Sequence, residues 1–207
     1  MAGQYLELEH SDYEPRSYSI ANAPINSNLI ELHIRLVDGG KLTNFLFNSL
    51  TEKSILRIEG PKGSFFLRED SECPIIFIAG GTGFGPIKAI IEHLINISSN
   101  RVIHLYWGVR SEEDLYSSLP SEWSEMYGNI SFEPVLSEAD QSWSGKKGYV
   151  HESVVDDFQD LTDYEVYSCG PPVMVNASHK SCLEYKLPKE NFFSDAFEYA
   201  NVISENE

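Results

Sequence analysis

The pattern of apolar and polar residues changes character near residue 70. Before that point, short runs alternate between apolar and polar positions and are separated by turn residues. Such alternation places one face of a strand against a core, and closely spaced runs of this kind predict an antiparallel sheet or barrel. The predicted strands are Tyr5–Glu9, Arg16–Ile20, Leu29–Leu36, Ile55–Glu59 and Ser64–Leu67, with a short helix over Leu42–Leu50.

After residue 74, continuous apolar runs alternate with amphipathic stretches. This alternation is typical of an open, Rossmann-like parallel α/β sheet. The predicted strands are Ile75–Ala79, Val102–Trp107, Ile130–Val135, Glu165–Ser168 and Asn191–Ser194. Because the acidic segment Arg68–Pro74 separates the two patterns, we expect a β domain over residues 1–70 and an α/β domain over residues 71–207.

The stretch Ala79–Pro86, with the sequence AGGTGFGP, joins the first of these apolar runs to an amphipathic helix. A glycine turn at a helix N-terminus exposes backbone N–H groups to an anion, and glycine lets a phosphate approach without a Cβ clash. Pro86 suits the first turn of that helix. Since Gly81, Gly83 and Gly85 are evenly spaced, the stretch differs from the fingerprint G-x-G-x-x-G. It predicts a nucleotide-phosphate site, with a plain tight turn as the alternative.

Glycine or small polar residues follow the predicted strands of the second half. Ligands bind beyond the carboxyl ends of the strands in an open parallel sheet. The segments at those ends are Gly80–Pro86, Gly108–Ser111, Ser137–Asp140 and Cys169–Pro172. Together they predict one extended crevice for an elongated ligand such as a dinucleotide.

Composition and charge narrow the classes of partner. The chain has 207 residues, of which 42% are hydrophobic and 12% aromatic, as in a packed globular core. A net charge of −17 argues against nucleic acid or an anionic membrane as the main partner. It allows a basic protein partner, although solubility alone also explains it.

Cysteine and histidine usage exclude several kinds of site. The chain has three cysteines and no C-x-x-C pair, which favours a reducing cytoplasm and excludes an iron–sulfur cluster held within this chain. None of the six histidines has zinc-hydrolase spacing, and no G-x-S-x-G elbow occurs, so no metal site is expected. We also expect no membrane span and no targeting leader.

Several motifs occur together in a family-like order. They are Arg16–Ser19, Gly39–Thr43, Gly60–Phe65, Gly80–Gly83 and Cys169–Pro172. In order and rough spacing they resemble the ferredoxin–NADP reductase superfamily. Within it, the chain is most similar to the NAD(P)H–flavin reductases and to the reductase domains that serve oxygenases and deoxysugar enzymes. The tail Asn191–Phe197 resembles the same subgroup, so the likeness runs from Gly3 to about Phe197.

The resemblance implies a flavin site in the first half. Arg16 would neutralise a flavin phosphate, Tyr18 would lie against the isoalloxazine, and Ser19 would hydrogen-bond near its N5. The backbone past the flavin would come from His33, Ile34 and Arg35. The FAD pyrophosphate would be held by Gly39, Gly40, Lys41, Leu42 and Thr43. The alternatives are an ordinary half-buried strand, an ordinary histidine, and a β-turn before a capped helix.

The resemblance also implies a nicotinamide site in the second half. The residues expected to bind the dinucleotide are Gly80, Gly81, Thr82, Gly83, Pro86, Gly108, Arg110, Cys169, Gly170, Pro171 and Pro172. Thr82 would lie between flavin and nicotinamide, Cys169 beside the nicotinamide C4, and Arg110 near the adenosine. Phe197 would stack on the flavin. The expected catalytic residues are Ser19, Thr82 and Cys169. The alternatives are a solvated Arg110, a buried Cys169 thiol and a core Phe197.

The expected activity is hydride transfer from NADH to FAD, or to loosely bound FMN or riboflavin, with electrons then passing to free flavin or to an acceptor protein. The acidic segment Ser137–Gln141 would repel a 2′-phosphate and favours NADH over NADPH. The alternative is a non-catalytic dinucleotide-binding or subunit protein. Family members have strands before the one at Gly3–Tyr5, so we expect an incomplete flavin-binding barrel; a mis-assigned start or a fragment would explain this.

Overall fold

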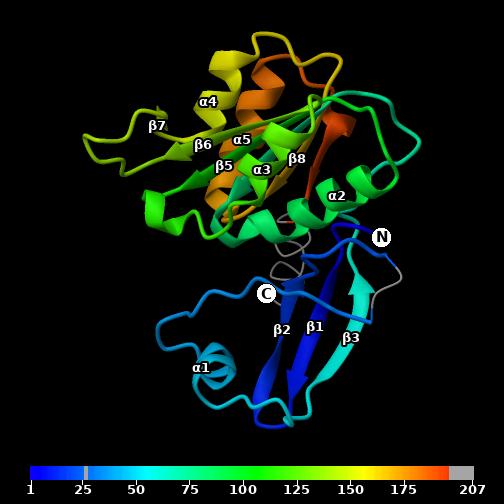
Figure 1. The fold of residues 1–207 in the computed structure, drawn as a ribbon, viewed down its shortest axis with the longest axis vertical. Helices are drawn as coiled ribbons and strands as arrows, with labels where there is room; N and C mark the ends of the chain where they lie inside the picture. Colours follow the sequence, from blue (N-terminus) through cyan, green and yellow to red (C-terminus); the bar gives the residue numbers. More distant parts are fainter. Residues whose placement is uncertain (26–27, 196–207) are drawn as a thin grey trace, which may run out of the picture.

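The computed structural model describes residues 1–25 and 28–195, arranged in two lobes (Figure 1). The N-terminal lobe contains a three-stranded antiparallel sheet in the order β2-β1-β3 and one helix, α1. The C-terminal lobe contains a six-stranded sheet with helices on both faces. The predicted class, an antiparallel sheet followed by a parallel α/β sheet, is confirmed.

The N-terminal sheet is small and packs on its helix. Its elements are β1 (Tyr5–His10), β2 (Tyr13–Ser19), β3 (Arg57–Lys62) and α1 (Lys41–Asn48). Leu6 and Leu8 of β1 point inward at alternate positions and meet Leu42 of α1 in a buried cluster. This core is small: it contains three buried leucines, and the side chains that pack around them are only partly buried.

Two strands predicted for this lobe are wrong. Leu29–Leu36 contributes only an isolated bridge between Leu32 and Ile20, and Ser64–Leu67 joins no strand. Leu36 is exposed, so the alternating pattern there has no second layer to cover it. Phe65 and Leu67 are buried instead against the core of the C-terminal lobe. Within residues 1–25 and 28–195 the strands therefore form no closed barrel.

The C-terminal sheet is parallel throughout, in the order β7-β6-β5-β4-β8-β9. Its strands are β4 (Ile75–Gly80), β5 (Ile103–Val109), β6 (Ile130–Leu136), β7 (Lys146–Lys147), β8 (Glu165–Cys169) and β9 (Phe192–Ser194). The strands predicted in this half are all present. The two-residue strand β7 is too short to show a periodicity and was not predicted.

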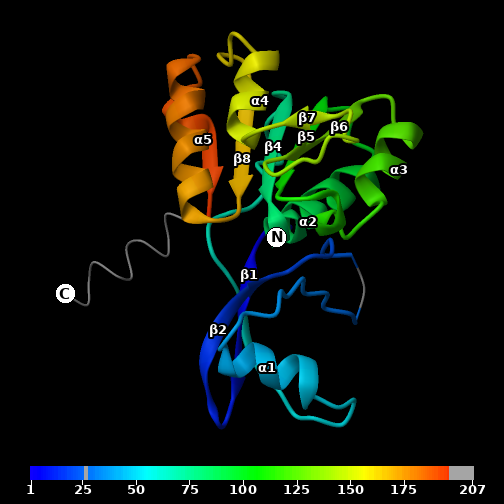
Figure 2. The same ribbon diagram turned by 90° about the vertical axis from the view of Figure 1, so that its left-hand side faces the viewer.

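Helices cover both faces of this sheet (Figure 2). One face carries α2 (Phe84–Asn96) and α3 (Leu119–Met126), and the other carries α4 (Val150–Asp157) and α5 (Pro172–Glu184). Strand β4 serves both layers, since Phe77 belongs to the core under α2 and α3 while Ile76 and Ile78 belong to the core under α4 and α5. This burial on both faces explains its continuous apolar run.

The segment between the lobes is tied to the sheet by one buried arginine. Arg101 donates to the carbonyl oxygens of Cys73, at 2.7 Å, and Arg68, at 3.1 Å, and to Glu165 Oε2 at 2.7 Å. These bonds hold the connecting segment at the amino ends of β5 and β8. Among the helices of the described residues, none has both the length and the apolar character needed to cross a bilayer.

Candidate functional site

A cleft of about 1030 Å³ lies at the carboxyl ends of the parallel strands. The sheet order reverses at β4, because β5 lies on one side of it and β8 on the other, and such a switch point is where open α/β sheets bind ligands. Both lobes line the cleft. The predicted residues that line it are His33, Ile34, Arg35, Gly80, Gly81, Thr82, Gly108, Arg110 and Pro171.

The glycine turn forms one wall of this cleft. Strand β4 ends at Gly80, a single 3₁₀ turn spans Gly81–Gly83, and α2 begins at Phe84. Gly81 has a φ of +53°, and a Cβ built on it would meet no atom within 4 Å. Trp107 Nε1 donates to the Gly81 carbonyl oxygen at 3.0 Å and so fixes the orientation of that peptide. The turn thus leaves space for a ligand group close to the backbone.

Gly83 serves packing rather than ligand access. A Cβ built on it would lie 2.1 Å from the carbonyl oxygen of Cys169, so α2 can approach the end of β8 this closely only with glycine there. Pro86, also predicted to be in the site, is buried in the first turn of α2. Neither residue lines the cleft, and both position the residues that do.

Cys169 ends β8 and is buried. Its Sγ donates to Asp195 Oδ2 at 3.2 Å. Burial, together with the nearby Asp195 carboxylate, raises the pKa of the thiol well above its ordinary value, so the group stays protonated at neutral pH. After it, Gly170 packs on Gly80, Pro171 lines the cleft and Pro172 begins α5. A neutral, buried thiol is a poor nucleophile.

Another wall of the cleft comes from the N-terminal lobe. His33, Ile34 and Arg35 line it, and the His33 ring lies between two partners. Its Nδ1 is 2.8 Å from the Tyr116 hydroxyl and its Nε2 is 2.8 Å from Glu31 Oε1. A histidine held at both nitrogens has a fixed ring orientation, so this wall is ordered.

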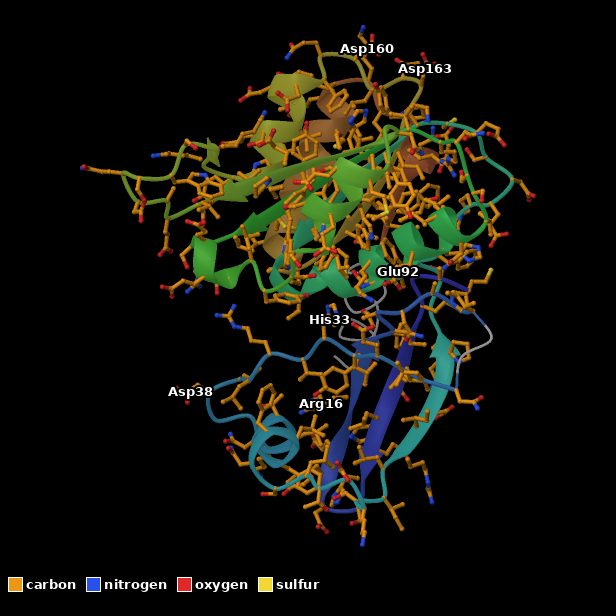
Figure 3. The ribbon with its side chains drawn as sticks, in the orientation of Figure 1. Arg16, His33, Asp38, Glu92, Asp160 and Asp163 are labelled. Atoms are coloured by element: carbon orange, nitrogen blue, oxygen red, sulfur yellow. The ribbon has the colours of Figure 1, made fainter. Side chains whose placement is uncertain are left out.

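The flavin-motif residues of β2 do not line the cleft. Arg16 Nη2 is 3.2 Å from Glu14 Oε2, and Tyr18 is half-buried beside the small leucine core. Burial raises the pKa of the Tyr18 hydroxyl, and Arg16 opposes this shift. Ser19 pairs with Tyr5 of β1. Figure 3 places Arg16 beneath His33, on the side of the lobe that carries α1.

The Gly39–Thr43 segment forms the start of α1. Gly39 has a φ of +72°, Gly40 is the N-cap, and Thr43 Oγ1 donates to the Gly40 carbonyl oxygen at 3.1 Å. Leu42 is buried in the leucine core, and Lys41 is exposed. None of these residues lines the cleft. The structure brings the glycine turn, His33–Arg35 and Pro171 together in the cleft. The Gly39–Thr43 segment lies elsewhere in the N-terminal lobe.

Several cleft residues were missed by sequence reasoning. They include Tyr116, Tyr149, His151, Val173 and Met174. Tyr149 and His151 follow β7 and lie with ring centroids 5.8 Å apart in a stacked arrangement. The signal that could have found Tyr149 is the glycine before it, since Gly148 has a φ of +104° in the turn from β7 into α4. Tyr116 lies in a polar loop that has no such signal.

Two lysines that were not predicted to matter lie close to the acidic segment after β6. Strand β7 places Lys146 and Lys147 beside Val135 and Leu136. Lys146 Nζ is 2.5 Å from Asp157 Oδ2, and Lys147 Nζ donates to the Asp140 carbonyl oxygen at 3.0 Å. Both ammonium groups are thus engaged in contacts of their own. Phe197, predicted to stack on flavin, lies outside the described residues.

Two family models match the chain, one over the N-terminal sheet and the other over most of the C-terminal sheet. Residues 1–67 match the oxidoreductase FAD-binding domain, and residues 77–180 match the oxidoreductase NAD-binding domain. Together these matches include almost all of the predicted site residues.

Two relatives are similar to this chain over nearly its whole length. The CDP-6-deoxy-L-threo-D-glycero-4-hexulose-3-dehydrase reductase of Yersinia pestis is 45% identical over 197 residues, covering 95% of this chain and 59% of that protein. The NAD(P)H-flavin reductase of Aliivibrio fischeri is 35% identical over 205 residues, covering 96% of this chain and 86% of that protein. The chain therefore spans about three fifths of the length of the first relative.

A solved structure shares the fold over nearly the whole chain. The crystal structure of the Amycolatopsis cytochrome P450 reductase GcoB superposes with a TM-score of 0.87 at 32% identity. The match covers 94% of this chain and 60% of the solved chain. The arrangement of the two lobes is thus shared with a solved reductase.

Proposed function

The chain belongs to the ferredoxin reductase-type oxidoreductases, which combine an FAD-binding with an NAD-binding domain, and from this premise we propose that it transfers a hydride from a nicotinamide dinucleotide to a flavin. Residues 1–70 form the flavin domain and residues 71–207 the nicotinamide domain in this proposal. Electrons then pass to free flavin or to an acceptor protein. The three free cysteines fit a reducing compartment, and we place the protein in the cytoplasm.

The single observation that carries the proposal is the cleft between the lobes. One wall is the glycine turn at the N-terminus of α2, and another is His33–Arg35 of the N-terminal lobe. Helix N-termini favour pyrophosphate, and the open space at Gly81 lets it approach. An elongated dinucleotide lying there would present its reactive end to the N-terminal lobe.

The chain's own residues would align the reactants rather than react. Thr82 lines the cleft and would contact the nicotinamide, with Pro171 beside it. Cys169, with its raised pKa, keeps a proton and would support this end of the site as a small neutral group. Hydride transfer needs alignment and a fixed electrostatic environment, which such groups supply.

The residues of the N-terminal lobe fit a flavin with a phosphate group. The exposed Arg16 guanidinium carries five N–H donors. Among the described residues it bonds to Glu14 and to the Pro15 carbonyl oxygen, so donors are left for a phosphate. Gly39–Thr43 would hold the pyrophosphate, while Tyr18 and Ser19 would contact the ring. Bound FAD would supply the hydride acceptor.

We expect NADH to be preferred over NADPH. Ser137 lines the cleft, Glu138 follows it, and Lys146 and Lys147 are engaged with Asp157 and Asp140. A 2′-phosphate would meet this acidic segment and would have to displace those contacts to reach a lysine. The ratio of kcat/KM for the two cofactors measures the preference, and comparable values would contradict it.

The activity is tested by following NADH oxidation by the purified chain with and without FAD, FMN or riboflavin. Turnover only with added flavin identifies a free-flavin reductase, and turnover by protein that retains FAD through gel filtration identifies a flavoprotein that serves another acceptor. Thr82→Ala is expected to lower kcat, whereas Thr162→Ala, on an exposed loop, serves as the control. No oxidation with any flavin would overturn the proposal and favour a binding module.

A further inference from the structure

A buried lysine joins α2 to the N-terminal lobe. The Lys88 side chain is 6% exposed, and its Nζ has three oxygen partners. They are Glu92 Oε1 at 2.7 Å on the same helix, and Glu31 Oε2 and the Ala21 carbonyl oxygen, both at 3.0 Å, in the N-terminal lobe. An ammonium group has three N–H donors, so every donor of this group is used.

The same contacts continue toward the cleft. Glu31 binds Lys88 through Oε2 and His33 through Oε1, and His33 contacts the Tyr116 hydroxyl through its other nitrogen. Tyr116 lies edge-on to Trp107 with centroids 5.0 Å apart, and Trp107 holds the Gly81 carbonyl. In Figure 3, His33 of the N-terminal lobe and Glu92 of α2 lie at the facing sides of the two lobes.

The chemistry of these groups determines which of them donates and which accepts in each hydrogen bond. A carboxylate only accepts, so His33 Nε2 must carry the hydrogen that bonds to Glu31. In the tautomer that carries its hydrogen on Nε2, Nδ1 is an acceptor and the Tyr116 hydroxyl donates to it. Without Lys88, the Glu31 carboxylate keeps its bond to His33 but loses the partner of its other oxygen, so its position is less constrained and the two rings lose part of their support.

We propose that Lys88 is a positioning residue that acts through Glu31 and His33 to hold the N-terminal wall of the cleft in register with the glycine turn. The inference rests on the proposed function, since it concerns the alignment of donor and acceptor across the cleft. The reaction needs the two within van der Waals reach, and misplacement by about 1 Å can cost roughly a hundredfold in rate. The contacts that begin at Lys88 end at His33 and Tyr116, which line the cleft, so they connect the lobe contact to the site.

Lys88→Met tests the proposal, because methionine keeps the length and removes the ammonium. Lys180→Met is the matched control, since Lys180 also pairs with a glutamate four residues later, Glu184, but is 80% exposed on α5. The measurement is the rate of flavin reduction by NADH in a single turnover, with the KM for NADH and the thermal midpoint alongside. We expect Lys88→Met to lower that rate about tenfold at temperatures where it is folded, with KM changed less.

An unchanged rate in folded Lys88→Met would overturn the proposal. If this variant does not fold, Glu31→Gln and Tyr116→Phe replace it, since both keep the shape of the side chain. Groups that act as one unit are not additive, so the double variant is expected to cost about as much as the more damaging single one. Rate losses that multiply would overturn the proposal.

A second readout separates this inference from the proposed function. Absence of NADH oxidation by the unmodified chain would contradict the proposed function alone. In that case the rate of amide hydrogen exchange at Ala23 reports on the contact between the lobes. The Ala23 N–H donates to Glu92 Oε2 at 3.2 Å, from the N-terminal lobe to α2. Faster exchange at Ala23 in Lys88→Met than in Lys180→Met would support the positioning role, and equal exchange would contradict it.

Discussion

Two glycines in the turn between β4 and α2 are required for different reasons. Gly81 has a φ of +53° and open space around its Cβ position, so it serves the bend and ligand access. Gly83 lies against the end of β8 and serves close packing. In the sequence both are members of one evenly spaced set of glycines. The contact of Gly83 is with Cys169, which is distant in the sequence, so the residues near Gly83 do not predict it.

Gly83→Ala is therefore expected to destabilise the protein by about 2 kcal/mol or more, since the new methyl group would meet the Cys169 backbone, which cannot yield like a flexible side chain. Urea denaturation measures the free energy of unfolding. Gly128→Ala is the control, because a Cβ there would meet nothing within 4 Å. Equal midpoints for the two variants would contradict the packing role of Gly83.

At the scale of elements, β5 and β8 are joined at their amino ends by a buried ion pair. Arg101 and Glu165 are 3% and 6% exposed, with Nη2 2.7 Å from Oε2. The Tyr167 hydroxyl also donates to Glu165 at 3.0 Å, while Arg101 holds the segment between the lobes. Breaking such a pair leaves an unpaired buried charge, which costs far more than losing an exposed pair.

Arg101→Met is expected to lower the free energy of unfolding by about 3–5 kcal/mol because it strands the Glu165 carboxylate. The control Arg57→Met removes an exposed partner of Glu9 and is expected to cost less than about 1 kcal/mol. Denaturant midpoints compare the two. A loss for Arg101→Met no larger than that for Arg57→Met would show that the carboxylate finds another partner or protonates.

A second polar contact ties α4 to the sheet and makes stability depend on pH. Asp157 accepts from Tyr106 Oη and Lys146 Nζ, each at 2.5 Å. Burial raises the pKa of this carboxyl, but the bonds from Lys146 and Tyr106 outweigh burial and hold it below its ordinary value. A lowered pKa stabilises the fold above the unfolded value, about 3.9, and this contribution is lost as pH falls through the folded value.

Asp157→Asn should therefore be clearly less stable than the unmodified chain at about pH 6, with the gap closing as the pH falls below about 4. Urea midpoints across that range measure the gap. Asp163→Asn, at an exposed loop position (Figure 3), controls for removing a charge alone. A gap that stays constant with pH would show that Asp157 contributes through shape and not through its charge.

At the scale of the whole molecule, charge is strongly unbalanced. The chain carries 32 acidic and 15 basic residues and a net charge of −17. Several lysines are engaged in local pairs, such as Lys62 with Glu7 at 2.7 Å and Lys186 with Asp160 at 2.6 Å. The excess acidic groups repel one another over distances comparable with the Debye length, and this repulsion opposes the compact state.

Raising NaCl from about 20 mM to about 500 mM at pH 7 should therefore raise the urea midpoint, because salt screens this repulsion. The same change at about pH 5 should have a smaller effect, since the sequence pI is about 4.6 and the net charge there is small. A midpoint that falls with salt at pH 7 would show that the exposed ion pairs outweigh the general repulsion.

The sequence by itself determined the longer strands of the parallel sheet and the position of the glycine turn. Burial on both faces makes β4 continuously apolar, and a glycine turn after it is local chemistry that can be read without a structure. The family resemblance also pointed to His33–Arg35, which line the cleft. The apolar strand and the glycine turn depend only on residues that are close together in the chain.

The tertiary structure alone decided which distant residues meet. It left Leu29–Leu36 without a ladder, placed β7 beside β6, and brought Tyr116 against His33 and Lys88 between the lobes. A lysine in an amphipathic helix is ordinarily solvated. Lys88 is buried because the N-terminal lobe packs over it, and no periodicity within α2 records which surface will cover that helix.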